Sequence, residues 1–385
     1  MKKHTGLAAC LLLIIFLVQP VGALAQDAVA AAMDEVLSGL DFSSVEDIRL
    51  TMPGGERSSG VEEIVRTLAS GGTIDLQAML AEMIGSFFSQ IGSLRSLMLG
   101  IMLPVILLSL LSHAIVYHAG RMRGMSRSAG TLMVLMPLIS VVVGQLAHTR
   151  ETIVEMTTRM DKLLPMLLTL LTALGGSASS AFLHPVVVAA SGSMVFLARE
   201  VVLRLVMCTC AVTAINHLSD RAHLSRMAQL LRSAVCWLLG VSFTVFLGAM
   251  SLQGVCSASI DGVAIRAAKY AVDNFVPIIG GMFSDTMDTL VGCTLIVKNA
   301  LGVAAVAVLV SSLLAPLLGT AASVFILKLC AALLEPVADG EIVAAIGDFA
   351  RTLVLFFVTM LCVATMYFLL IVQVLLVGNL TVMLR

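Results

Sequence analysis

The chain has 385 residues and a formal net charge of −1, with 59% hydrophobic and only 12% charged residues. Its mean hydropathy of +1.04 excludes an ordinary soluble globular protein. The nearly balanced charge gives no sign of nucleic-acid binding. Apolar stretches near the bilayer length of about 20 residues recur from Leu97 almost to the C-terminus. In lipid, such stretches satisfy their backbone polar groups as helices, so we predict an all-α, polytopic membrane protein with a small exported helical region.

The N-terminus predicts export across a membrane. The basic start Lys2-Lys3-His4 precedes an apolar core at residues 7–18, and Ala23-Leu24-Ala25 places small residues at the spacing of a signal-peptidase site. We therefore predict a signal peptide over residues 1–25, with an uncleaved signal anchor as the alternative.

Residues 26–95 form the only sizeable polar part of the chain. Apolar residues repeat at helical spacing over 61–68 and again over 74–94, which predicts short amphipathic helices that lead into the first span. Because this exported amphipathic region has little core of its own, we expect it to dock on the lipid bilayer, on a partner or on a second copy in a homo-oligomer. A mobile linker is the alternative before Gly60.

Residues 96–385 are predicted to form a transmembrane helical domain with about seven spans. Basic residues at 121–127 and 217–232 place these loops in the cytosol, whereas an acidic loop at 335–348 suits the outside. The last span, residues 352–378, then ends the chain in the cytosol.

Three segments predict interruptions in this domain. The mixed charges at 150–162 indicate a loop after a span at 129–147. Between Leu163 and Asn216, either three short crossings or one span beside a re-entrant hairpin fits the hydropathy. The small residues Gly319-Thr320 predict a tight turn between two helices.

The sequence has no motif for catalysis or for a bound cofactor. The cysteines and histidines lack the spacing of metal ligands, and there is no phosphate-binding loop, zinc-protease motif or nucleophile elbow. We therefore predict a non-enzymatic protein without cofactors, in which any ATP-driven step needs a separate subunit.

Charged residues gather between positions 256 and 299, beside a predicted helix break at residues 274–281. The candidate partner-binding or pore-lining residues are Asp261, Arg266, Lys269, Asp273, Asp285 and Asp288. Two carboxylates beside a broken helix at membrane depth would make an ion or proton site. An exposed segment with Lys269 and Asp273 paired at i, i+4 explains the same residues.

Two other charged positions interrupt apolar stretches. Glu200 and Arg204 have the i, i+4 spacing of a structural ion pair, whereas Lys328 has no acidic residue near it in sequence.

A long motif in the same region resembles a known family. It begins with Ser259-Ile260-Asp261-Gly262-Val263 and continues through Asn274-Phe275-Val276-Pro277-Ile278-Ile279-Gly280-Gly281 to Asp285. Together with the signal peptide and the polytopic C-terminal part, it resembles stage III sporulation protein AE of endospore-forming bacteria.

The resemblance implies a subunit of the secretion or feeding channel that joins the mother cell to the forespore. It implies a multi-pass location in the mother-cell membrane, an extracytoplasmic N-terminal region, and partners that include other stage III sporulation channel proteins, a cytosolic ATPase and ring-forming subunits. It supplies no catalytic residues. A secondary transporter or permease is the alternative, favoured by the intramembrane charges.

Overall fold

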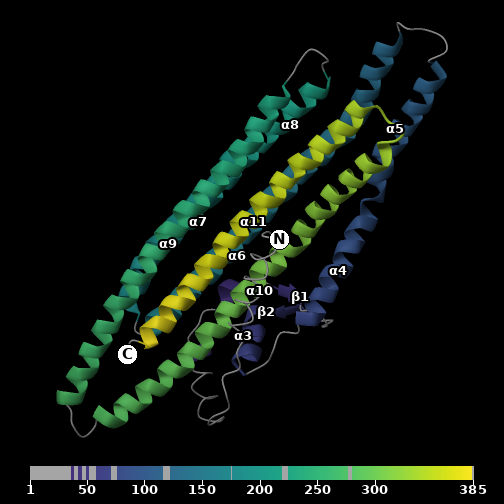
Figure 1. Cartoon of the computed structure of the whole chain (residues 1–385). Helices are drawn as coiled ribbons and strands as arrows, with labels where there is room; N and C mark the ends of the chain where they lie inside the picture. The colour runs from purple at the N-terminus through teal and green to yellow at the C-terminus, as the bar shows by residue number, and fades with distance from the viewer. Residues whose placement is uncertain are drawn as a thin grey trace.

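The computed structural model describes residues 36–38, 42–45, 49–51, 58–70, 76–115, 122–174, 176–218, 224–275 and 280–383. The predicted signal peptide lies outside the described residues. The described part is a bundle of long helices with one small two-stranded sheet at its side, as Figure 1 shows. The predicted all-α class is confirmed, apart from these two short strands.

The N-terminal region contributes short elements before the bundle begins. They are η1 (Phe42–Val45), β1 (Arg49–Thr51), β2 (Ser58–Gly60), α3 (Val61–Ala69) and α4 (Leu76–Ser93). Arg49 of β1 pairs with Gly60 of β2 in an antiparallel register. α3 buries the side chains of Val61, Ile64 and Val65, and α3 and α4 both lie against the long helix α10 (Figure 1). The predicted amphipathic helix at 61–68 is therefore confirmed, and this region docks on its own chain.

The bundle itself consists of eight further elements. They are α5 (Arg95–Ile115), α6 (Met122–Ala173), α7 (Ser177–Phe196), the π-helical turn η2 (Leu197–Val202), α8 (Leu203–Leu218), α9 (Ser225–Phe275), α10 (Gly280–Leu334) and α11 (Gly340–Met383), of which α7, η2 and α8 form one continuous run. α10 and α11 lie side by side and pack on α6, while α9 packs on α11 from the other side (Figure 1).

Several helices are longer than a membrane is thick. α6, α9 and α10 have 52, 51 and 55 residues. At about 1.5 Å per residue each is roughly 75–80 Å long, against about 40–45 Å for a bilayer with its headgroups. Five described helices are apolar and long enough to cross a membrane, and a bent pair from α4 and α5 would make a sixth. Because of their length, α6, α9 and α10 must extend beyond the bilayer.

The predicted loop at residues 150–162 is wrong, because α6 continues through this segment without a break. Glu155 and Arg159 form an ion pair one helical turn apart, and Thr157 and Thr158 donate hydrogen bonds to carbonyl groups of the preceding turn. The segment is polar, but its side chains form ion pairs and hydrogen bonds with residues one turn away on the same helix. Charge content alone therefore gave the wrong local structure.

The two arrangements predicted between Leu163 and Asn216 are also wrong. α6 ends at Ala173, and the run α7–η2–α8 then returns along the bundle as a single element. The chain turns at Gly176, where a Cβ atom would come within 2.9 Å of the carbonyl oxygen of Leu171. Only glycine permits this close approach. Pro185 lies inside α7, and Arg199 and Glu200 lie in the π-helical turn. The run is therefore helical from α7 to α8.

The predicted turn at Gly319-Thr320 is wrong as well, because α10 is continuous from Gly280 to Leu334. Gln145 of α6 donates a hydrogen bond to the Thr320 hydroxyl, which donates in turn to the carbonyl of Pro316. Gly319 faces Gln90 of α4. The small residues allow neighbouring helices to approach α10, which is their common use in membrane bundles.

Contacts between distant helices fix which connections share an end of the bundle. His217 near the end of α8, Arg232 near the start of α9 and Asp348 near the start of α11 are in contact. The end of α8, the start of α9 and the start of α11 therefore lie at one end of the bundle, which we call the α8–α9 end. The prediction that the loops at 217–232 and 335–348 lie on opposite faces of the membrane is wrong.

The remaining connections follow from the helix directions. α6 is antiparallel to α10. Gln145 of α6 contacts Thr320 of α10, whereas Leu171, which comes later in α6, lies near Lys298, which comes earlier in α10. The start of α6 therefore also lies at the α8–α9 end. The end of α11 lies at the opposite end of the bundle, as do the end of α9 and the start of α10 (Figure 1). The prediction that the last span ends on the same face as residues 217–232 is therefore wrong.

Candidate functional site

The six predicted site residues lie in two helices that project from the bundle. Asp261, Arg266, Lys269 and Asp273 belong to the last turns of α9, and Asp285 and Asp288 belong to the first turns of α10. Their side chains lie outside the described part of the structure. The predicted pairing of Lys269 with Asp273 and the predicted ion site therefore stay predictions.

The extent of the projection follows from one contact. Gln373 of α11 donates a hydrogen bond of 3.1 Å to the carbonyl of Met250 in α9. Beyond this level α9 continues to Phe275, about 37 Å, whereas α11 continues to Met383, about 15 Å. Figure 1 shows the end of α9 and the start of α10 reaching well past the C-terminus. We call residues 252–289 the projecting hairpin.

A cluster of charged residues ties three helices together at the α8–α9 end. Asp348 Oδ1 accepts hydrogen bonds from Arg232 Nη1 at 3.1 Å and from Arg351 Nη1 at 3.0 Å, and Asp348 Oδ2 lies 3.0 Å from His217 Nε2. Arg232 Nη2 also donates to the Asp348 carbonyl and to Thr213. Only 16% of the Arg232 side chain and 23% of the Asp348 side chain are exposed, so the charges are largely shielded from solvent and lipid.

A single buried lysine occupies the opposite part of the bundle. Lys298 of α10 is 0% exposed, and its Nζ donates hydrogen bonds of 2.9 Å to the carbonyl of Leu375 and to Asn379 Oδ1 in α11. A Cβ atom on Gly378 would overlap Lys298 Nζ and come within 3.2 Å of Leu171 Cδ1 in α6. Glycine at 378 therefore makes room for the lysine head where three helices meet.

These two polar anchors bracket a layer in which α10 and α11 carry no charge. α11 has no charged residue from Thr352 to Asn379, and α10 has none from Asn299 to Leu327. The distance along α11 from Asp348 to Leu375 is about 40 Å, close to the thickness of a bilayer with its headgroups. The Asp348 cluster and Lys298 thus mark the two borders of the layer that suits the membrane, and the projecting hairpin lies beyond the Lys298 border.

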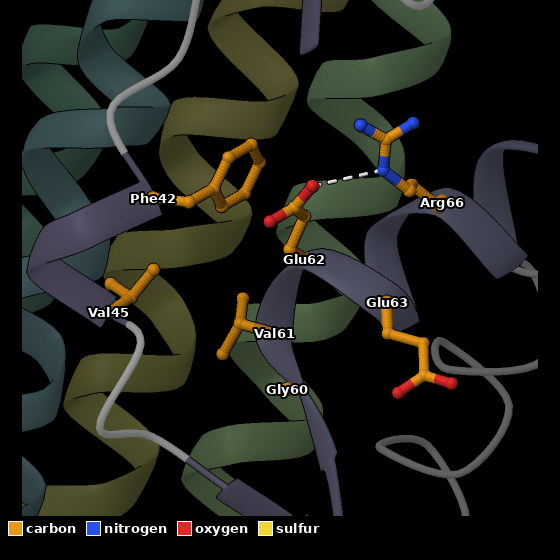
Figure 2. Close-up of a pocket in the computed structure, with 7 residues that line it drawn as sticks. All are labelled: Phe42, Val45, Gly60, Val61, Glu62, Glu63 and Arg66. Atoms are coloured by element: carbon orange, nitrogen blue, oxygen red, sulfur yellow. Dashed lines mark hydrogen bonds and ion pairs between the residues drawn. The ribbon is translucent and has the colours of Figure 1, made fainter. Parts of the chain in front are cut away.

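The N-terminal region contains an open pocket of about 540 Å³, shown in Figure 2. Phe42 and Val45 of η1 face Val61 of α3 across the pocket, and Glu62 forms an ion pair of 3.0 Å with Arg66 above them. Both side chains of this pair are about half exposed. Its lining combines an apolar floor with the Glu62–Arg66 pair and the carboxylate of Glu63.

The described part of the chain contains no metal site and no disulfide. There, no group of three His, Cys, Asp or Glu side chains is placed to hold a metal ion. The described cysteines are free, and Cys210, Cys293 and Cys330 are buried as small apolar residues.

The sequence did not predict the role of Lys298 or of Asp348. Lys298 lies just before a long apolar stretch, which is the one local signal that it borders the membrane layer. Asp348 was assigned to a loop, although Arg351 one turn later suggests a helix. The predicted pair Glu200–Arg204 is confirmed as an ion pair, with Arg204 75% exposed, and Lys328 is exposed on α10.

The long apolar helices define an α-helical, multi-pass membrane protein. A family model described as stage III sporulation protein AE matches residues 59–378, so the chain belongs to that family. Stage III sporulation protein AE of Bacillus subtilis (strain 168) is 32% identical over 238 residues, which cover 62% of this chain and 60% of the relative. The chain therefore aligns with less than two thirds of that protein's length. No solved structure matches the chain.

Proposed function

We propose that this protein is the multi-pass, non-enzymatic membrane subunit of the sporulation secretion or feeding channel, and that the projecting hairpin docks its partners. Its family supports a role in sporulation. The proposal rests on one observation above all: the long motif from Ser259 to Asp285 lies on the helices that extend past the bundle. A surface that packs inside its own chain would not need this extension.

The arrangement of charges supports the same function. Arg266 and Lys269 lie beyond the Lys298 border of the membrane layer, at a level where water and partner proteins reach the helix. At such a level a lysine or arginine can form ion pairs with a partner without the cost of burial in lipid. Because these residues lie beyond the membrane layer, partner binding explains them better than an ion site at membrane depth does.

The positive-inside rule gives the proposed orientation. Arg121, Arg123 and Arg127 precede or begin α6, and Arg221 and Arg226 lie at the connection of α8 with α9, all at the α8–α9 end. That end would face the mother-cell cytosol, where a separate ATPase would act. The N-terminal region and the projecting hairpin would face the forespore, where ring-forming subunits would bind.

Affinity capture from sporulating cells tests this proposal. Tagged wild-type protein, extracted in mild detergent, should recover a secretion-type ATPase and ring-forming sporulation proteins. The double variant R266E/K269E should recover about tenfold less of at least one partner, equivalent to about 1.4 kcal/mol, while its amount in the membrane is unchanged. Arg226→Glu, at the far end of the same helix, is the matched control for recovery of the ring-forming proteins.

Two results would argue against the proposal. Wild-type protein recovered without any sporulation partner would favour the transporter alternative and direct the work to solute uptake. Equal loss of membrane insertion and of partner recovery in R266E/K269E would assign these residues to the fold of the hairpin.

A further inference from the structure

One face of α6 carries charged residues at a depth where its neighbours α10 and α11 carry none. The charges are Arg150, Glu151, Glu155, Arg159, Asp161 and Lys162. Two contacts fix their depth: Gln145 lies level with Thr320 of α10, and Leu171 lies level with Lys298. All six residues therefore lie beside α10 residues 299–319, which are free of charge.

The neighbouring helix α11 gives the same depth. Tyr367 lies near Thr157 and Asp161 of α6, in the middle of the uncharged stretch that begins at Thr352. The charged face of α6 is thus level with the centre of the apolar layer and not with one of its borders.

The chain itself leaves this face uncovered. Arg150, Glu151, Glu155 and Asp161 are exposed, and 47% of the Glu155 side chain and 24% of the Arg159 side chain are accessible although the two are paired. In a bilayer, a charged side chain near the centre of a helix costs about 2.5–3.5 kcal/mol on insertion scales, and such residues usually face other protein or water. A single chain with this face toward lipid would be costly, so the face requires a cover.

The order of positive and negative charges indicates which partner covers this face of α6. The charges form three layers along the helix, and each layer contains one acid and one base: Arg150 with Glu151, Glu155 with Arg159, and Asp161 with Lys162. A two-fold axis along the membrane normal brings each layer of one chain opposite the same layer of a second chain. Every acid can then approach a base, whereas a partner of one net sign would meet repulsion in each layer.

We infer that the charged face of α6 binds a second copy of this chain, so that the protein is at least a dimer in the membrane with its charged layers paired across the interface. This inference does not depend on the proposed sporulation function, because it follows from depth, exposure and charge alone. It also does not involve the projecting hairpin.

Reversing one charge in the middle layer tests the inference. Glu155→Arg gives two copies with only positive charge in this layer, and Arg159→Glu gives copies with only negative charge. Each variant alone should self-associate at least tenfold less than the wild type when copies with two different tags are co-expressed and one tag is captured. The two variants expressed together should associate as strongly as wild type, because each layer again contains both signs.

The mixed pair also controls for folding, since recovery of the heteromeric complex requires both variants to be folded. A photoreactive residue at position 151 should cross-link two copies, whereas the same residue at Val245, which is 66% exposed on α9, should not. The inference is overturned if single and mixed variants all associate as wild type does, or if position 151 cross-links only to lipid or to other proteins.

Discussion

Asp348 of α11 accepts a hydrogen bond of 3.1 Å from Arg232 of α9, although the two residues are 116 positions apart in sequence. The same carboxylate contacts His217 of α8, so three helices converge on one acidic group at the α8–α9 end. This contact shows that His217 and Arg232 lie beside Asp348, although the sequence predicted them on opposite faces of the membrane.

Loss of the Asp348 carboxylate should destabilise the bundle. Asp348→Asn leaves the guanidinium of Arg232 largely buried and without its anionic partner, which costs about 2–4 kcal/mol for well-shielded pairs. The apparent Tm in mild detergent should fall by several degrees. Arg351→Gln, which removes a 68% exposed partner of the same carboxylate, should change it by less than about 1 kcal/mol. Equal effects of both variants would contradict the central role of Arg232.

The fit of Lys298 against Gly378 gives a second prediction. Gly378→Ala should destabilise the protein by about 1–3 kcal/mol, because the added methyl group displaces a buried ammonium that has two hydrogen bonds. Lys298→Met keeps a flexible stem without the charge, so the double variant should be less destabilised than the sum of the two changes. Gly240→Ala, where nothing lies within 4 Å of the new methyl group, is the control. Strict additivity would refute this contact.

The shared end of two connections can be tested by chemical labelling. Cysteines introduced at Asp339 and at Ser225, both exposed, should react with a membrane-impermeant maleimide from the same side of the membrane. By the positive-inside rule that side is the cytosol, so both should label only after the cells are opened. Labelling from opposite sides would be incompatible with the contact between Asp348 and Arg232.

Docking of the N-terminal region on α10 depends on the buried face of α3. Ile64 is 1% exposed, so Ile64→Ala should cost about 2–4 kcal/mol and loosen this region from the bundle. This loosening would be measured as faster proteolysis or hydrogen exchange of α3, without change in α10 and α11. Arg66→Gln removes an ion pair with Glu62 in which both side chains are about half exposed, so it should have little effect. An effect as large as that of Ile64→Ala would argue against apolar docking.

The sequence by itself determined the class of the protein and several local features. Apolar stretches of bilayer length impose helices, because the backbone has no other partner in lipid. The pattern at 61–68 determined α3, and the i, i+4 spacing of Glu200 and Arg204 determined their pair. Each of these depends on residues within a few turns of one another.

Only the tertiary structure decided how those helices are joined and which charges meet. Hydropathy assigned residues 150–162 to a loop, because a polar segment can leave the membrane or form one face of a helix, and only its neighbours distinguish the two. The same limit hid Lys298, whose partners lie 77 and 81 positions away, and the contact of Arg232 with Asp348. Such contacts depend on the packing of whole helices, which no local pattern of residues specifies.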